Sequence, residues 1–506
     1  MWRKFRDQRS SGRAEALFRI AFAAVLVVQL LTLRSNVDYF YSSEGLSPTP
    51  AGFEAYYTPA RVAVCFWAWF ASAVLLLLGA FTRVAALVCF LGCFYFLVLR
   101  GPQATHAADW LLPSLAFQLA LLPSNRHYAL DQRWRRSPRA ADVPAWPLRL
   151  AQLSTAFFYF TAGTSKLMDP MWRQGAGIFM TFANPLLSHF DLSRVASLPV
   201  VAPAISYAVV AWECAMPLLL FWRRTRWLAL ASATVFLVSI DLTLPVGWFA
   251  WFCLANLLVF ADVTEWPRAW RERLPWLAAP SPPATPASPI HEPAWKHGAV
   301  TAFLVFHLTS FGVLQVAYAC LAFHSYAWAR RIASLPVLGA YGYAIANVRY
   351  YALWPSQIFC PIHYVYFEAE SESQSESQTT DSRVLTLPPF DDQGRAHIGW
   401  RESREVREGV FLMTAAHGLG SLGWRRLFTH VAEAERQRSA SGQCLRELRA
   451  YALTIWPGPG SFATDLRRGR QFLQRAELTS TGTAACQVAK LADQPRDTLP
   501  ELVQPQ

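Results

Sequence analysis

The first two thirds of the sequence alternate between long apolar runs and short polar connections, after which the chain becomes polar. A bilayer core about 30 Å thick requires about 20 apolar residues in helical form. Two of the runs, the fourth and the eighth, are short, as is typical of tilted, re-entrant or partly buried helices. The pattern predicts about nine transmembrane helices, at Glu15–Leu33, Val62–Phe81, Val84–Leu99, Asp109–Pro123, Leu148–Leu167, Val200–Trp222, Trp227–Leu244, Gly247–Phe260 and Gly298–Ala322.

The polar remainder of the chain has the pattern of a small water-soluble region. Its low-complexity run at 368–380 is typical of disorder. The stretch 382–390 predicts a strand, whereas Glu402–Arg436 and Gln443–Trp456 predict amphipathic helices. We therefore expect an all-α polytopic membrane protein with a small C-terminal α+β region.

These patterns divide the chain into five parts. A basic N-terminal segment precedes the membrane domain, and a Pro-rich linker separates that domain from one further transmembrane helix. The C-terminal region follows. The expected boundaries are 1–14 for the N-terminal segment, 15–262 for the membrane domain, 263–297 for the linker, 298–323 for the additional helix and 324–506 for the C-terminal region.

Arginine and lysine residues on the short loops predict the orientation. Four clusters, in segments 3–13, 126–139, 223–226 and 268–273, all fall on one side of a bundle with nine spans. Basic loops lie preferentially on the cytoplasmic side. The N-terminus is therefore expected in the cytoplasm, and the odd number of spans places the C-terminal region outside it.

Composition agrees with a membrane protein and limits the possible partners. The chain is 53% hydrophobic and 16% charged, against about 25% charged in ordinary globular proteins. Its net charge of +12 is accounted for by the basic loops, so we expect the lipid bilayer as a partner and no nucleic acid. No nucleotide-binding or hydrolase motif is present, and no Cys/His spacing indicates a metal site.

Polar side chains within the apolar runs are the first candidates for a site, because a central Arg, Lys or Asp costs about 2.5 to 3.5 kcal/mol there. They are Arg19, His106, Asp109, Gln118, Lys166, Glu213, Asp241 and Asn256.

Lys166 is the most informative of these residues. Near the outer end of the fifth span, a buried lysine can be a neutral amine and act as a base, or it can extend to the lipid headgroups. His106 and Asp109 begin the fourth span on the same face, where His106 can relay a proton or merely cap the helix. Gly163 allows close approach of a neighbouring helix.

Two carboxylates have open interpretations. Glu213 lies in the middle of the sixth span and requires either protonation or a cationic partner, for which Arg19 is a candidate. Asp241 lies near the outer end of the seventh span, where it can line a cavity or face water.

Several blocks, taken in order, resemble the membrane domain of vitamin K-dependent gamma-carboxylases, a family that includes the horizontally transferred transmembrane (HTTM) domain proteins. The resemblance covers residues 15–262. The most specific block lies in and after the fifth span. The matching residues are Phe18-Arg19, Glu44-Gly45, Gly79, Thr82-Arg83, Leu115 to Leu119, His127-Tyr128, Asp131, Tyr159-Phe160, Ala162-Gly163, Lys166-Leu167, Trp172 and Gly175.

The resemblance implies a specific chemistry. Lys166 matches the base in oxygenation of reduced vitamin K, a naphthoquinol cofactor, and His106 matches a histidine that assists at the glutamyl site of a secreted peptide. Tyr159, Gly163, Trp172, Asp109, Asp241, Glu213 and Arg19 would support that site. Two departures stand out: Ser165 replaces a second lysine, and the seventh span has no histidine.

Three hypotheses follow. The first is a quinol- and oxygen-dependent enzyme that modifies, for example by carboxylation, a peptide at the outer membrane face. The second is a non-enzymatic factor for maturation, export or immunity of a secreted peptide, which the departures and the short tail favour. A transporter is a weaker third, because no inverted repeat is visible.

Overall fold

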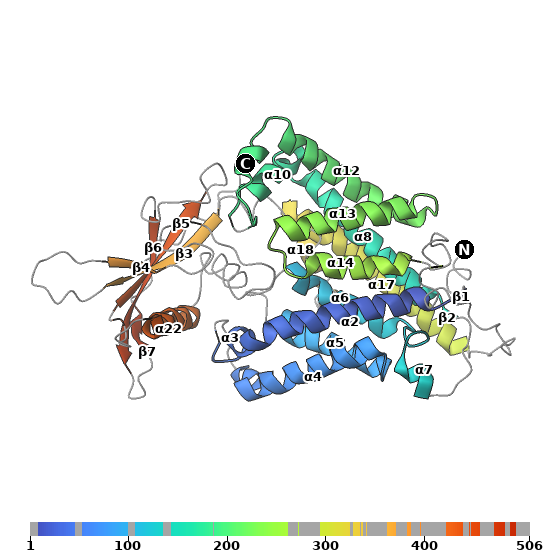
Figure 1. Cartoon of the computed structure of the whole chain (residues 1–506), viewed down its shortest axis with the longest axis horizontal. Coiled ribbons are helices and arrows are strands. Elements are labelled where there is room, and N and C mark those ends of the chain that lie inside the picture. The colour runs from blue at the N-terminus through green and yellow to red at the C-terminus, as the bar shows by residue number, and fades with distance from the viewer. Residues whose placement is uncertain are drawn as a thin grey trace, which may run out of the picture.

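The computed structural model describes residues 9–45, 53–99, 107–134 and 143–261 except 186, parts of 294–341, and six elements of the C-terminal region. The membrane domain is a helix bundle, with the C-terminal elements gathered at one end (Figure 1). The described α-helices before the C-terminal sheet are α2 (Arg13–Leu33), α3 (Val37–Tyr41), α4 (Pro59–Leu78), α5 (Thr82–Cys93), α6 (Ala107–Leu121), α7 (Leu130–Trp134), α8 (Trp146–Met168), α9 (Pro170–Arg173), α10 (Gly177–Phe182), α11 (Ser193–Ala196), α12 (Val201–Phe221), α13 (Arg226–Thr243), α14 (Phe249–Leu257), α17 (Ala294–Phe323) and α18 (Ala327–Ala333).

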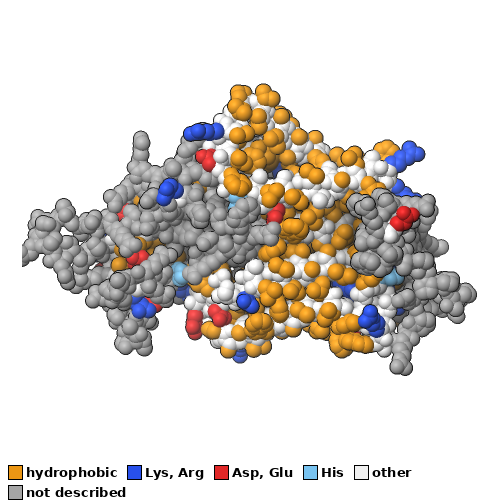
Figure 2. Space-filling model, in the orientation of Figure 1, with side chains coloured by type: hydrophobic (Ala, Val, Ile, Leu, Met, Phe, Trp, Pro, Cys, Tyr) orange, Lys and Arg blue, Asp and Glu red, His pale blue; other side chains and the backbone are white. Residues whose placement is uncertain are grey.

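A helix occupies each of the nine predicted apolar runs. Among the described residues, four helical segments are both long and apolar enough to cross a membrane: Arg13–Tyr41, Pro59–Leu78, Val201–Phe221 and Arg226–Thr243. The visible face of the bundle is covered by hydrophobic side chains, and the charged ones lie mainly toward its two ends (Figure 2). Such a surface fits a lipid environment, while the number nine stays a prediction.

The direction of α8 follows from the pairing of two short strands. Strand β1 (Arg9–Ser10), just before α2, pairs with β2 (Val143–Pro144), just before α8. The two helices therefore start at the same end of the bundle. Lys166 lies 20 residues into α8, about 30 Å from that end at 1.5 Å per residue. Arg19, six residues into α2, lies only about 9 Å from it.

The C-terminal region forms an antiparallel sheet in the order β4-β3-β5-β6-β7. Helix α22 (Ser421–Arg438) packs on it, with Phe428 against Phe367 at 5.6 Å between ring centroids. The strands are β3 (Ile362–Glu370), β4 (Ser382–Leu385), β5 (Glu447–Ile455), β6 (Arg470–Ser480) and β7 (Cys486–Leu491).

The structure corrects the expectation of a helix at Gln443–Trp456, which contains strand β5 instead. Leu448, Ala450 and Ala452 are buried, and the residues between them are less so. This two-residue alternation is a strand pattern. The low-complexity segment also begins later than expected, because Glu368–Glu370 belongs to β3. The strand expected at 382–390 is present at Ser382–Leu385, and part of the first tail helix as α22.

The C-terminal region contacts the bundle at the end opposite to β1 and β2. Tyr39 of α3, which follows α2, lies 2.7 Å from its hydroxyl to Nε2 of His430 on α22. Because α3 is at the far end of α2, the C-terminal sheet and Lys166 share one end of the molecule (Figure 1).

Candidate functional site

Lys166 forms a buried ion pair with Glu213. Its Nζ donates to both carboxylate oxygens, at 2.9 and 2.7 Å. Only 3% of Lys166 is exposed, so its side chain does not extend to the headgroups. The two hydrogen bonds join α8 to the middle of α12, 12 residues and about 18 Å from the start of that helix.

Gly163 explains how the two helices approach closely enough for this pair. A Cβ at Gly163 would lie 2.7 Å from Sγ and 2.8 Å from the backbone nitrogen of Cys214. Cys214 follows Glu213, and Gly163 lies one turn before Lys166, so the contact at the glycine brings the carboxylate opposite the ammonium group.

Trp172 covers the pair from the side. Nζ of Lys166 lies 5.3 Å from the centroid of the Trp172 ring, within cation–π range. The ring packs directly against Gly177, because a Cβ at that position would lie 2.3 Å from the ring. Asp169 begins the short helix α9 by accepting a hydrogen bond from the backbone of Met171 at 2.8 Å.

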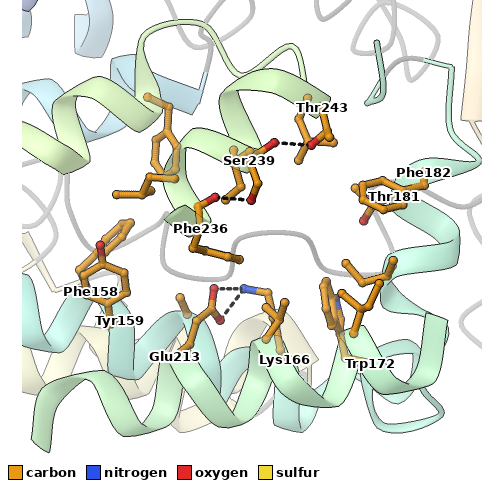
Figure 3. A pocket seen from close by; sticks show the side chains of 18 residues that line it. Phe158, Tyr159, Lys166, Trp172, Thr181, Phe182, Glu213, Phe236, Ser239 and Thr243 are labelled. Carbon is orange, nitrogen blue, oxygen red and sulfur yellow. Dashed lines mark hydrogen bonds and ion pairs between the residues drawn. The ribbon is translucent and has the colours of Figure 1, made fainter. Parts of the chain in front are cut away.

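The ion pair borders a largely apolar cavity of about 180 Å³ between α8, α9, α10, α12, α13 and α14. In Figure 3, Glu213 and Lys166 point into this space from one side, with Ser239 and Thr243 of α13 facing them. Tyr159 and Trp172 stand at its two flanks. The hydroxyls of Ser239 and Thr243 donate to backbone carbonyls of their own helix. Among the described residues of the lining, Lys166 and Glu213 are the charged ones.

Tyr159 contributes a phenol to the lining. Its ring packs edge-on against Phe158 and Trp212, at 5.3 and 5.6 Å between centroids. The side chain is 3% exposed, and its hydroxyl has no hydrogen-bond partner among the described residues.

Arg19 does not pair with Glu213, contrary to one of the expectations. It lies at the other end of the bundle, where its guanidinium donates to the backbone carbonyls of Ser124 at 3.1 Å and Tyr128 at 2.6 Å. Asp131 completes this cluster by accepting from the backbone nitrogens of Phe81 and Thr82 at 2.7 and 2.9 Å. We call these residues the Arg19 cluster; no residue of it lines the cavity.

The other candidates divide between the walls of the bundle and regions that are not described. Asp109 is buried and accepts from Nε2 of Gln29 at 3.2 Å, away from the cavity lining. Asp241 is buried near the end of α13 and is not among the lining residues. His106 lies outside the described residues, so its expected proximity to Lys166 stays a prediction.

His189 is a candidate that sequence reasoning missed. Its backbone nitrogen donates to the carbonyl of Thr243 at 2.9 Å, which places it beside the rim of the cavity. Burial lowers the pKa of His189, and the Asp241 carboxylate and a hydrogen bond to Leu244 oppose that shift. A single histidine in a loop, 52 residues before Asp241 (241 − 189), carries no periodic signal that would have revealed it.

The model of the HTTM domain family matches residues 8–266. The chain belongs to the HTTM family. The match covers just over half of the sequence, 259 of 506 residues (266 − 8 + 1), and includes both the cavity and the Arg19 cluster. It confirms the family expected from the sequence and supports a membrane protein. No solved structure matches the chain.

The family resemblance and the structure together divide the matching residues into two groups. Arg19, Gly79, Tyr128 and Asp131 form one contact cluster at the β1–β2 end. The block from Tyr159 to Gly175 builds the cavity and its ion pair at the other end. The C-terminal sheet lies outside the HTTM match.

Proposed function

We propose that this HTTM protein is a membrane enzyme that takes a lipid-soluble aromatic alcohol of the reduced naphthoquinone class into the Lys166 cavity, with Lys166 as the base. The observation that carries the proposal is an ion pair, almost completely buried, at the edge of an apolar cavity. Buried ionisable residues in membrane segments are costly, and they commonly mark functional sites.

The cavity has room for at least one aromatic ring and has a largely apolar surface. An apolar cavity of about 150 Å³ is enough to hold benzene, and this one is about 180 Å³. Phe158, Phe182 and Phe236 supply aromatic walls. Trp172 adds an indole ring next to the lysine.

The position of the cavity supports access from the bilayer. Ile205 of α12 and Ser239 of α13 belong to the lining and are also exposed on the outer surface of the bundle. Both helices are long and apolar enough to span a membrane. An apolar ligand dissolved in lipid would therefore reach Lys166 between α12 and α13 without crossing water.

The ion pair supplies the proton-accepting group. Transfer of one proton from the ammonium to the carboxylate leaves a neutral amine and a carboxylic acid, which avoids burying two charges. The lone pair on Nζ of Lys166 then takes the proton of the ligand hydroxyl. The ammonium that forms stays between Glu213 and the ligand oxygen and stabilises the negative charge on that oxygen.

The resemblance to the carboxylases extends the proposal. When bound, a reduced naphthoquinone supplies oxygen-dependent chemistry that generates a strong base, which in the carboxylases drives carboxylation of peptide glutamates. His106 would assist at the second substrate, a secreted peptide. Since the C-terminal sheet lies at the same end as Lys166, we place both on the outer face, with the N-terminus in the cytoplasm.

A non-enzymatic role in maturation, export or immunity of a secreted peptide is the second candidate. One observation favours it: Lys166 donates two hydrogen bonds to Glu213, as a purely structural ion pair would. Ser165 in place of a second lysine points in the same direction.

Both candidates are tested by incubating the full chain in lipid nanodiscs with 2-methyl-1,4-naphthalenediol, with and without oxygen. Mass spectrometry detects the quinone epoxide. We expect epoxide only with oxygen, and at least a 100-fold loss in Lys166→Met, the lower end for removal of a general base.

Two controls make the result interpretable. Thr164→Ala on the same helix changes a hydroxyl that bonds to the carbonyl of Phe160 and does not line the cavity, so its activity should be unchanged. The paired variant Lys166→Met/Glu213→Leu removes the base without leaving an unpaired carboxylate. Wild-type protein that binds the diol but makes no epoxide would exclude the oxygenase and leave the second candidate.

A further inference from the structure

Tyr159 presents an unusual combination of burial and missing hydrogen bonding. The side chain lines the cavity and is 3% exposed, yet its hydroxyl has no partner among the described residues. The aromatic contacts to Phe158 and Trp212 hold the ring without using the hydroxyl. A buried hydroxyl without a partner costs free energy, and phenylalanine would fill the same space without that cost.

The spacing of Tyr159 and Lys166 indicates how far apart the two polar atoms of a ligand between them would be. They are seven residues apart on α8, which is two turns on one face and about 10.5 Å along the axis. Side chains on a helix lean in the same direction, so this axial spacing sets the scale of the separation between their polar ends. Two hydrogen bonds of about 2.8 Å each then leave about 5 Å between the two polar atoms of the ligand. This is close to the distance between two oxygens attached at opposite positions of a six-membered ring.

We propose that Tyr159 is the second polar anchor of the ligand and makes the cavity selective for a ring with two opposed oxygens. The Tyr159 hydroxyl donates to the ligand oxygen farther from Lys166, while the nearer oxygen carries the proton that Lys166 accepts. This inference rests on the proposed function only in requiring that the cavity hold an aromatic alcohol. It adds the recognition of the second oxygen.

A pair of matched ligands tests the anchor by binding alone. The full chain in nanodiscs is titrated without oxygen with 2-methyl-1,4-naphthalenediol and with 2-methyl-1-naphthol, which lacks the distal oxygen. Isothermal titration calorimetry measures both affinities without depending on any one of the 21 tryptophans of the chain. In wild-type protein we expect the diol to bind about tenfold more tightly, the value of one buried hydrogen bond.

Tyr159→Phe is the decisive variant, because it removes only the hydroxyl. The diol should then bind about tenfold more weakly while binding of the naphthol is unchanged, so that the preference disappears. Without ligand, the variant should unfold at the same or a higher temperature than the wild type, since an unpartnered buried hydroxyl has been removed.

The outcomes separate this inference from the proposed function. Equal binding of the two ligands by the wild type would overturn the role of Tyr159 while leaving an aromatic-alcohol site. A preference that survives in Tyr159→Phe would also overturn it, as would a lower unfolding temperature with unchanged binding, which indicates a packing role. Failure of both ligands to bind the wild type would instead refute the proposed function.

Discussion

Among the described residues of the bundle, Arg19 and Lys166 are the two most deeply buried cations, one nearer each end, and they have different hydrogen-bond partners. Arg19 donates to backbone carbonyls of the segment after α6, at Ser124 and Tyr128. Lys166 donates to a side chain, the carboxylate of Glu213. Arg19 is completely buried and Lys166 almost so, so burial alone does not distinguish them.

The difference in partners indicates a difference in role. Backbone carbonyls neither accept a proton nor move without moving the chain, and the Arg19 cluster has no residue in the cavity lining. A carboxylate can exchange a proton with the amine, and Lys166 has room beside it for a ligand. We therefore assign structure to the Arg19 cluster and chemistry to the Lys166–Glu213 pair.

The largest expected effect follows from removing Arg19. In Arg19→Leu, two buried carbonyls lose their donors and the connection that carries Ser124, Tyr128 and Asp131 loses its anchor. With about 1–3 kcal/mol for each unsatisfied group, we expect a loss of about 2–6 kcal/mol and little folded protein after extraction. Size-exclusion chromatography and thermal unfolding measure this.

Arg83 provides the matched control for that substitution. It lies in α5 just after the residues capped by Asp131, but its side chain is exposed. Arg83→Leu should change stability by no more than about 0.5 kcal/mol. If both variants fold like the wild type, Arg19 is not a structural anchor and the contrast with Lys166 fails.

A double-mutant cycle at the ion pair gives an effect of similar size. Lys166→Met and Glu213→Leu should each cost about 3–5 kcal/mol, because each leaves one buried charge without its partner. Both together should restore stability to near wild type or above it, since a buried ion pair replaced by apolar side chains is often neutral or stabilising. Thermal unfolding of the four proteins gives the coupling.

Ligand binding supplies the second readout of this cycle. A stable double variant that no longer accepts the diol would show that the ion pair is retained for function and not for folding. A double variant as unstable as the sum of the two single variants would contradict this and place the pair with the Arg19 cluster as a structural feature.

The two regions also differ in how far the sequence predicted them. Apolar runs of sufficient length identified the helices, and the block from Tyr159 to Gly175 identified the part of the chain that builds the cavity. The partner of Lys166 was not predicted, because the contact of Gly163 with Cys214 that sets the α8–α12 register depends on packing in three dimensions. For the same reason the sequence offered Arg19 as a partner for Glu213, although Arg19 lies at the other end of the bundle.

The smallest expected effect concerns His189, beside the rim of the cavity. Burial lowers the pKa of its imidazole below the usual value, with Asp241 and the Leu244 backbone opposing. Between the lowered and the usual pKa, the unfolded chain therefore binds more protons than the folded one, so stability should fall as the pH decreases below about 6.5. Unfolding temperatures at pH 7.5 and 5.5 should show a larger decrease for wild type than for His189→Gln, by on the order of one degree.

Asp241→Asn sharpens this last comparison. Without the carboxylate the pKa of His189 should fall further, which extends the loss of stability to lower pH. His189→Gln/Asp241→Asn should lack that extension, because no imidazole remains to respond. If the stability of the single and double variants follows the same pH profile, Asp241 does not act on His189. The pKa of the imidazole beside the cavity then does not depend on the carboxylate at the end of α13.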